Sequence, residues 1–125
     1  MMEARRILTP QQRGRAAEES AASFLLEQGY QIIARNYRTR LGEIDLIARE
    51  NGYLVFIEVR SRRHEGLGLP QETVDKSKQN RLRRLARQYL ADHQQFEALC
   101  RFDVVGVLID LYGTIHSMEL IRDAF

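Results

Sequence analysis

The sequence predicts an α/β fold in which helices flank a mixed sheet, and its 125 residues suffice for a single domain, 1–125. Two segments have helical periodicity, at about residues 10–28 and 72–93. An Asn51-Gly52 pair between two strand-like runs is typical of a β-hairpin. These observations give the element order αβββαβ, with an additional strand expected at the C-terminus.

The first helix is predicted by its start and stop signals. Thr9 supplies an N-cap hydroxyl, Pro10 occupies the first helical position, and Gln12 completes a capping box. We expect the helix to run to about Gln28 and to end at Gly29. A short strand, YQIIARNY, should follow it.

The hairpin in LGEIDLIARENGYLVFIEVR (residues 41–60) has a predictable register. A two-residue turn at Asn51-Gly52 places Glu50 opposite Tyr53, so residues whose numbers sum to 103 face each other across the two strands. Strand alternation then places the four charged side chains within the hairpin on one face.

The second half of the chain should contain a loop at residues 62–72, a helix from about 72–74 to 93, and a strand at 100–110. The helix has a buried stripe that consists of Leu82, Leu85, Ala86, Tyr89 and Leu90. The strand is apolar on both faces, which is typical of a central position in a sheet. The segment TIHSMEL is a candidate for a last, shorter strand.

The predicted register brings two acids into conflict. It places Asp45 opposite Glu58, and Glu43 opposite Arg60. Directly opposed side chains have Cβ atoms about 5 Å apart, and two carboxylates at that spacing repel each other unless a cation lies between them. A divalent metal would resolve the conflict. The alternative is an edge hairpin with one solvated face and a Glu43–Arg60 ion pair.

Each helix contributes one candidate residue to the same region. Glu18 lies at the edge of the first helix's buried stripe, one turn after Gly14, where a missing side chain would permit close backbone approach. Its alternative role is that of a partly solvated carboxylate. Lys78 extends the buried stripe of the second helix and could reach the sheet or project into solvent. An arginine face on the opposite side consists of Arg83, Arg84 and Arg87. Such a face is usually only solvated.

Composition limits the functional class. The net charge is +2, and the basic residues are nearly all arginine, which favours a phosphate-rich partner or reflects a GC-rich genome. The sequence lacks an apolar run long enough to span a bilayer, and its N-terminus lacks the apolar segment of a signal peptide. The single Cys100 fits a reducing compartment, so a cytoplasmic protein without a membrane partner is expected. Asp103, an acid in an apolar strand, should pair with a nearby arginine.

Several motifs together resemble the YraN-like family, which has the restriction-endonuclease-like fold of the PD-(D/E)XK nuclease superfamily and is related to Holliday-junction resolvases. They are GRAAE, ARNYR, GEIDLIA, VFIEVRSR, SKQNRL and RFDVV, and they extend from about residue 14 to 103. The terminal RDAF is also similar to the family's C-terminus.

This resemblance implies a metal-dependent nuclease. Glu18, Asp45 and Glu58 fall on the superfamily's acidic positions, and with the carbonyl of Val59 they would bind Mg²⁺ or Mn²⁺ for the hydrolysis of DNA to 5′-phosphate products. Arg60 occupies the place of the lysine in the E-x-K motif. Arginine keeps the positive charge that stabilises a phosphorane, but it cannot lose its proton to help generate hydroxide.

We therefore expect an endonuclease in which Arg60 stabilises the transition state and Lys78 positions phosphate. Two alternatives remain: a non-catalytic nucleic-acid-binding module on the same fold, and a scaffold that contacts protein partners. A branched or junction DNA with two-fold symmetry would favour a homodimer.

Overall fold

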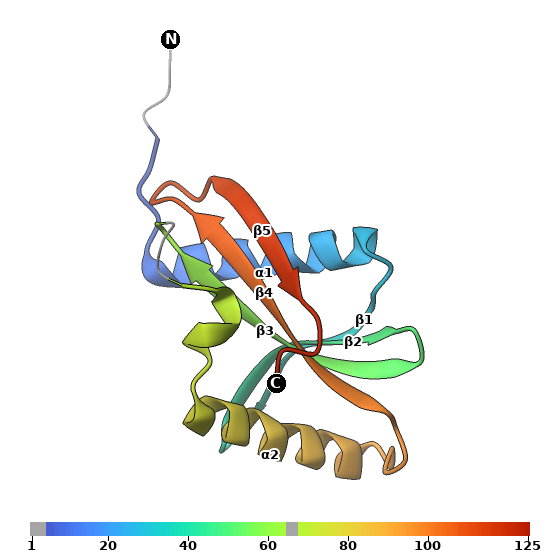
Figure 1. The fold of residues 1–125 in the computed structure, drawn as a ribbon. Helices are drawn as coiled ribbons and strands as arrows, with labels where there is room; N and C mark the ends of the chain where they lie inside the picture. The colour runs from blue at the N-terminus through green and yellow to red at the C-terminus, as the bar shows by residue number, and fades with distance from the viewer. Residues whose placement is uncertain (1–4, 65–67) are drawn as a thin grey trace.

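The computed structural model describes residues 5–64 and 68–125 and contains one five-stranded sheet (Figure 1). The elements in chain order are α1 (Pro10–Glu27), β1 (Gln31–Thr39), β2 (Gly42–Glu50), β3 (Tyr53–Arg62), the short 3₁₀ helix η1 (Pro70–Thr73), α2 (Lys76–Asp92), β4 (Cys100–Ile109) and β5 (Ile115–Ile121). The spatial strand order is β1-β2-β3-β4-β5. Only the β3–β4 pair is parallel, so the predicted mixed sheet and the additional C-terminal strand are both confirmed.

The two helices cover opposite faces of the sheet (Figure 1). Ala17, Ala21 and Leu25 of α1 pack with Val55 and Ile57 of β3. Leu82, Leu85 and Tyr89 of α2 belong to a second apolar cluster, which contains the alternate β3 residues Leu54 and Phe56. The central strands are therefore buried on both sides, as the continuous apolar runs predicted.

The helix boundaries follow from their caps. Thr9 and Gln12 form the predicted capping box, and α1 ends before Gly29, which has a φ of +94°. The second helix begins later than predicted. The side chain of Asp75 accepts a hydrogen bond from the backbone N–H of Lys78 at 2.8 Å, and Pro70–Thr73 form the separate helix η1.

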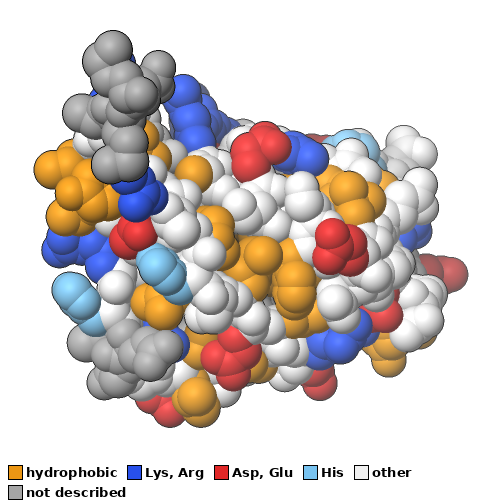
Figure 2. Space-filling model, turned by 90° about the horizontal axis from the view of Figure 1, so that it is seen from above, with side chains coloured by type: hydrophobic (Ala, Val, Ile, Leu, Met, Phe, Trp, Pro, Cys, Tyr) orange, Lys and Arg blue, Asp and Glu red, His pale blue; other side chains and the backbone are white. Residues whose placement is uncertain are grey.

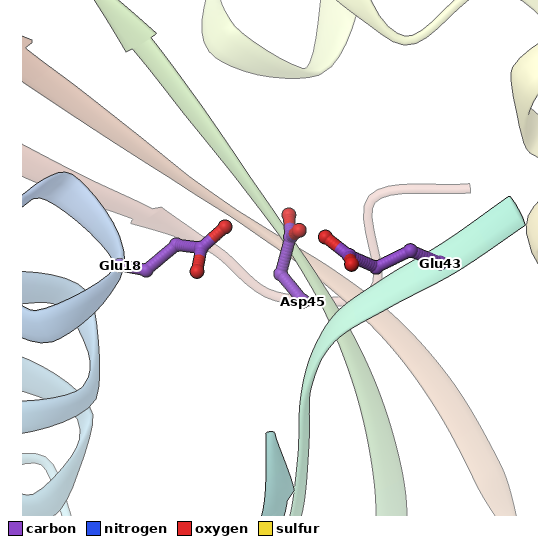
Figure 3. A group of neighbouring side chains, drawn as sticks. All are labelled: Glu18, Glu43 and Asp45. Carbon is purple, nitrogen blue, oxygen red and sulfur yellow. The ribbon is translucent and has the colours of Figure 1, made fainter. Parts of the chain in front are cut away.

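The hairpin turn has the predicted register. Asn51 and Gly52 both have positive φ, and Glu50 pairs with Tyr53. The β2–β3 pairing continues to Leu46–Ile57 and ends there. Beyond that point β2 and β3 diverge, as the ribbon in Figure 3 shows. Ile44 belongs to the α2-side cluster whereas Leu46 belongs to the α1-side cluster, so simple alternation fails at Asp45.

Figure 2 looks down on the molecule from the side on which β5 lies in Figure 1. Hydrophobic side chains gather near the centre of this face, and acidic and basic side chains are scattered around them. Half-buried Ile115, Met118 and Leu120 of β5 pack against the α1-side core. Among residues 5–64 and 68–125, no helix is long and apolar enough to cross a membrane.

Candidate metal centre

Three carboxylates converge where β2 leaves β3 (Figure 3). Glu18 extends from α1, Glu43 and Asp45 extend from β2, and one oxygen of each lies within 4.8 Å of the others. The metal ligands predicted from the sequence included Glu18 and Asp45 but not Glu43, which only the alternative interpretation used, in an ion pair with Arg60. The signal for Glu43 was present, because it precedes Asp45 by two residues in the same strand.

Glu58 is a buried carboxylate next to Asp45. Glu58 is only 6% exposed and Asp45 only 8% exposed. Burial, and after it the adjacent Glu58 carboxylate, together raise the pKa of Asp45 to about 8. Two carboxylates at this depth cannot both be ionised without a strong nearby positive charge.

A hydrogen bond explains why the hairpin opens at this point. Oδ2 of Asp45 accepts the backbone N–H of Val59 at 2.8 Å. A side-chain acceptor thus replaces a backbone acceptor of the neighbouring strand, and it anchors the Asp45 carboxylate beside Glu58. The Val59 N–H also lowers the pKa of Asp45, but by less than burial and Glu58 raise it.

The periodicity of α1 correctly distinguished Glu18 from Glu19. Glu18 is half-buried and its pKa is raised, first by burial and then by Glu43, whereas the Glu19 side chain is 74% exposed and pairs with Arg35. Glu18 and Arg15 also line a hollow of about 250 Å³ that reaches solvent. The close approach of the protein's own backbone expected at Gly14 is wrong, because a Cβ atom placed there would meet no described atom within 4 Å.

The Glu43–Arg60 ion pair, which belonged to the alternative interpretation of the hairpin as a solvated edge, is not found. Glu43 pairs instead with Arg38, its neighbour across the β1–β2 ladder. The Arg60 guanidinium donates to Oγ1 of Thr73 at 3.0 Å and to the Thr73 carbonyl at 3.3 Å. The two strands have already separated at this level, so Arg60 instead connects β3 to the segment that precedes α2.

Lys78 points to the sheet. Its ammonium lies 3.3 Å from Oε1 of Glu58 and provides a positive charge next to the buried acid pair. The arginine face predicted on α2 is only partly solvated: Arg84 and Arg87 are exposed, but the guanidinium of Arg83 lies 5.4 Å from the ring centroid of Phe125.

The predicted pairing of Asp103 with an arginine is confirmed. Arg101 binds it through two hydrogen bonds of 2.8 Å, and the Tyr30 hydroxyl donates a third at 2.7 Å. The hydroxyl of Tyr30 is buried and bonded to Asp103, so its pKa is raised. This network belongs to the α1 side of the sheet and is separate from the carboxylate cluster.

Among solved structures, the chain has a distant likeness to "The structure of Pyrococcus Furiosus SfsA in complex with Ca2+". It has a TM-score of 0.35 and 16% identity, and it covers 90% of this chain and 62% of that chain. A likeness this distant supports no conclusion about the site.

Sequence relatives match the chain over nearly its whole length. A UPF0102 protein of Moorella thermoacetica is 46% identical over 94% of this chain and 98% of its own. A UPF0102 protein of Pelotomaculum thermopropionicum is 43% identical over the full length of both. The family model described as "Uncharacterised protein family UPF0102" matches residues 17–107. The chain therefore belongs to the UPF0102 family, the YraN-like group with a PD-(D/E)XK nuclease-like fold.

Proposed function

We propose that this protein is a divalent-metal-dependent endonuclease that hydrolyses DNA, with branched or junction DNA as the substrate class. The observation that carries the proposal is the buried Asp45–Glu58 pair, with Glu18 and Glu43 close to Asp45 and Lys78 as a nearby cation. Such a group of acids is unfavourable in an unliganded fold and is suited to a hard cation with oxygen ligands.

Mg²⁺ or Mn²⁺ would be held by Glu18, Asp45 and Glu58, together with the carbonyl of Val59. The cluster adds Glu43 to this set. When bound, the cation supplies Lewis acidity for the phosphodiester and lowers the pKa of the attacking water. Asp45 is fixed by the Val59 N–H, and Lys78 keeps a positive charge beside Glu58. The remaining charge on the phosphate would be stabilised by Arg60.

The direct test of the proposal is incubation of the protein with branched and linear DNAs in Mn²⁺ or EDTA. We expect Mn²⁺-dependent products with 5′-phosphate ends. Binding of the same DNAs without cleavage, in Mg²⁺ and in Mn²⁺, would contradict the proposal. That result would favour the non-catalytic module, which the arginine at the E-x-K lysine position also supports.

Arg60 variants test its role at the phosphate. Arg60→Lys should keep cleavage within about tenfold, roughly 1.4 kcal/mol in the barrier, because the charge remains. Arg60→Ala should lower turnover by roughly 10²–10³-fold, the range for the loss of one preorganised charge-stabilising donor. The measurement is single-turnover cleavage at saturating DNA, with DNA affinity measured separately.

Thr73→Val is the matched control for Arg60. It removes the hydroxyl that accepts from Arg60 but leaves the guanidinium charge in place. We expect turnover close to wild type. A loss equal to that of Arg60→Ala would mean that Arg60 acts only by positioning the segment before α2.

Lys78 should matter more than the other lysine of the chain, Lys76, which is exposed in the first turn of the same helix. Lys78→Ala should reduce cleavage by roughly tenfold or more, because Glu58 loses its nearest cation. Lys76→Ala removes the same charge from the helix and should leave the rate within about twofold. Equal rates for the two variants would exclude Lys78 from the site.

A further inference from the structure

We propose that a second phosphate-binding site, formed by arginines at the far end of β3, holds the DNA strand beyond the carboxylate cluster. This inference rests on the proposed function, because the DNA strand in question is the one whose scissile phosphate would lie at the carboxylate cluster. Arg13, Arg62 and Arg63 line a hollow of about 210 Å³ together with Pro10, Ser61 and Ile109. Three guanidinium-bearing side chains around a hollow of this size are suited to a phosphodiester oxygen, which arginine binds through its planar fork.

In the part of the chain that the structure describes, neighbouring acids do not neutralise the charge of the hollow. Within residues 5–64 and 68–125, no carboxylate lies within ion-pair distance of these three arginines. The bonds found for Arg13 and Arg62 go to neutral backbone carbonyls, those of Leu8 and Gly68. Arg35, which lines the hollow beside Glu18, differs in this respect because it pairs with Glu19.

Two elements connect the hollow to the acids. From Glu18, α1 runs back to Pro10, a rise of roughly 12 Å over eight residues. From Glu58, β3 runs forward to Arg62, roughly 13 Å over four residues. Both paths lead to the same hollow. At about 3.4 Å of axial rise per nucleotide, this separation places the second phosphate about four nucleotides from the one at the acids.

Gly14 provides an independent observation on the same path. It lies one turn before Glu18, on the same side of α1, and the space next to its Cα is open. A glycine inside a helix costs roughly 0.5–1 kcal/mol relative to alanine, and no packing contact in the described fold requires it. Close passage of a nucleic-acid backbone between the acids and the arginines accounts for a missing side chain at this position.

The test is DNA binding in EDTA, so that it is independent of metal and of cleavage. A fluorescein-labelled four-way junction and a linear duplex would be titrated by anisotropy over a range of salt concentrations. Arg62→Ala with Arg63→Ala should weaken binding roughly 10–100-fold near 0.1 M salt and reduce the log–log salt slope by about 1, because one phosphate contact is lost. Arg84→Ala with Arg87→Ala removes the same charge from the exposed face of α2 and should leave the slope unchanged.

Two further variants separate charge from folding. Arg62→Lys with Arg63→Lys should retain the wild-type slope, because a lysine also releases a counterion from the phosphate. Gly14→Ala should raise the melting temperature by about 2–5 °C, yet weaken DNA binding. A stabilised Gly14→Ala variant with unchanged affinity would show that no strand passes at this point.

The outcomes distinguish this inference from the proposed function. If the wild type binds DNA with the expected slope changes but cleaves nothing, the arginine site stands and hydrolysis is wrong. If the wild type cleaves with Mn²⁺ but the Arg62–Arg63 double alanine variant binds like wild type, the arginine site is wrong and the nuclease stands. Equal losses in both double alanine variants would also overturn the site, because they would show only the effect of overall charge.

Discussion

Asp45→Asn is expected to abolish the rise in melting temperature that Mn²⁺ causes in the wild type, and to lower cleavage by roughly 10³-fold or more. A cation that binds only the folded state stabilises it by mass action, so the loss of a central carboxylate removes that stabilisation. A loss of about 4 kcal/mol of charge stabilisation in the transition state corresponds to the expected fall in rate.

The same substitution should stabilise the metal-free protein. Asparagine keeps an oxygen that can accept the Val59 N–H, but it removes the charge that burial and Glu58 disfavour. At about 1.4 kcal/mol per pKa unit, the raised pKa of Asp45 corresponds to a few kcal/mol at neutral pH. Thermal unfolding in EDTA should therefore occur at a higher temperature in Asp45→Asn than in the wild type.

The pH dependence has a definite sign. The pKa of Asp45 is about 8 in the folded state, against an ordinary value of 3.8. Between these values the folded state retains a proton that the unfolded chain has released, so stability falls as pH rises from about 4 to about 8. The fall should be smaller in Asp45→Asn. The Mn²⁺ effect on the wild type should increase over the upper part of this range, because the cation displaces the proton.

Glu19→Gln is the matched control for Asp45→Asn. It removes one carboxylate from α1 next to Glu18 in sequence, but from an exposed side chain that pairs with Arg35. We expect a wild-type Mn²⁺ response and wild-type cleavage. Calorimetric titrations giving the same Mn²⁺ affinity for the wild type and Asp45→Asn would disprove the metal site.

Local signals predicted most of this architecture. The Asn51-Gly52 turn determines the hairpin register because both residues adopt positive φ readily, and the observed Glu50–Tyr53 pair follows from it. Helical periodicity distinguished Glu18 from Glu19 because α1 has a single apolar face, even though the buried residues of that face are mostly alanine. Lys78 was on the correct face for the same reason.

The end of the β2–β3 pairing was not predictable from that register. It depends on a competition between a backbone acceptor and the Asp45 carboxylate for the Val59 N–H, which periodicity does not detect. The partner of Glu43 was missed for a related reason. A strand inside a sheet has two neighbours, and the hairpin turn defines only one of them, whereas Arg38 lies on the other.

The C-terminal residues were also beyond local signals. The backbone N–H of Asp123 donates to Asp103 at 2.9 Å, and the ring of Phe125 stacks on Phe102 with a centroid distance of 5.1 Å. These contacts join positions about 20 residues apart through the β4–β5 pair. Their formation depends on the assembled sheet, which explains why RDAF matched a family pattern without indicating a structural role.

Asp103→Ala is expected to have the largest effect on folding stability, a loss of about 3–5 kcal/mol, because it leaves the Arg101 guanidinium without its main counter-charge. Asp103 is fully buried and accepts hydrogen bonds from Arg101, the Tyr30 hydroxyl and the Asp123 N–H. The Arg101 side chain is only 10% exposed, although it also donates to Glu50 at 2.8 Å. Urea denaturation would measure the loss, with Glu19→Ala as a surface ion-pair control that should cost less than about 1 kcal/mol.

Replacement of the whole network separates uncompensated charge from lost packing. Arg101→Met and Asp103→Leu with Tyr30→Phe remove the charges of the Arg101–Asp103 pair and the hydroxyl together, while Glu50 keeps Arg122 at 3.7 Å as its counter-charge. Apolar replacements of similar volume are often neutral or stabilising. The triple variant should therefore recover most of the stability that Asp103→Ala loses. A triple variant as unstable as Asp103→Ala would mean that the geometry of the network, and not the compensation of buried charge, holds β4 to the C-terminal segment. At temperatures where both variants remain folded, their Mn²⁺ response should equal that of the wild type, because the network is separate from the carboxylate cluster.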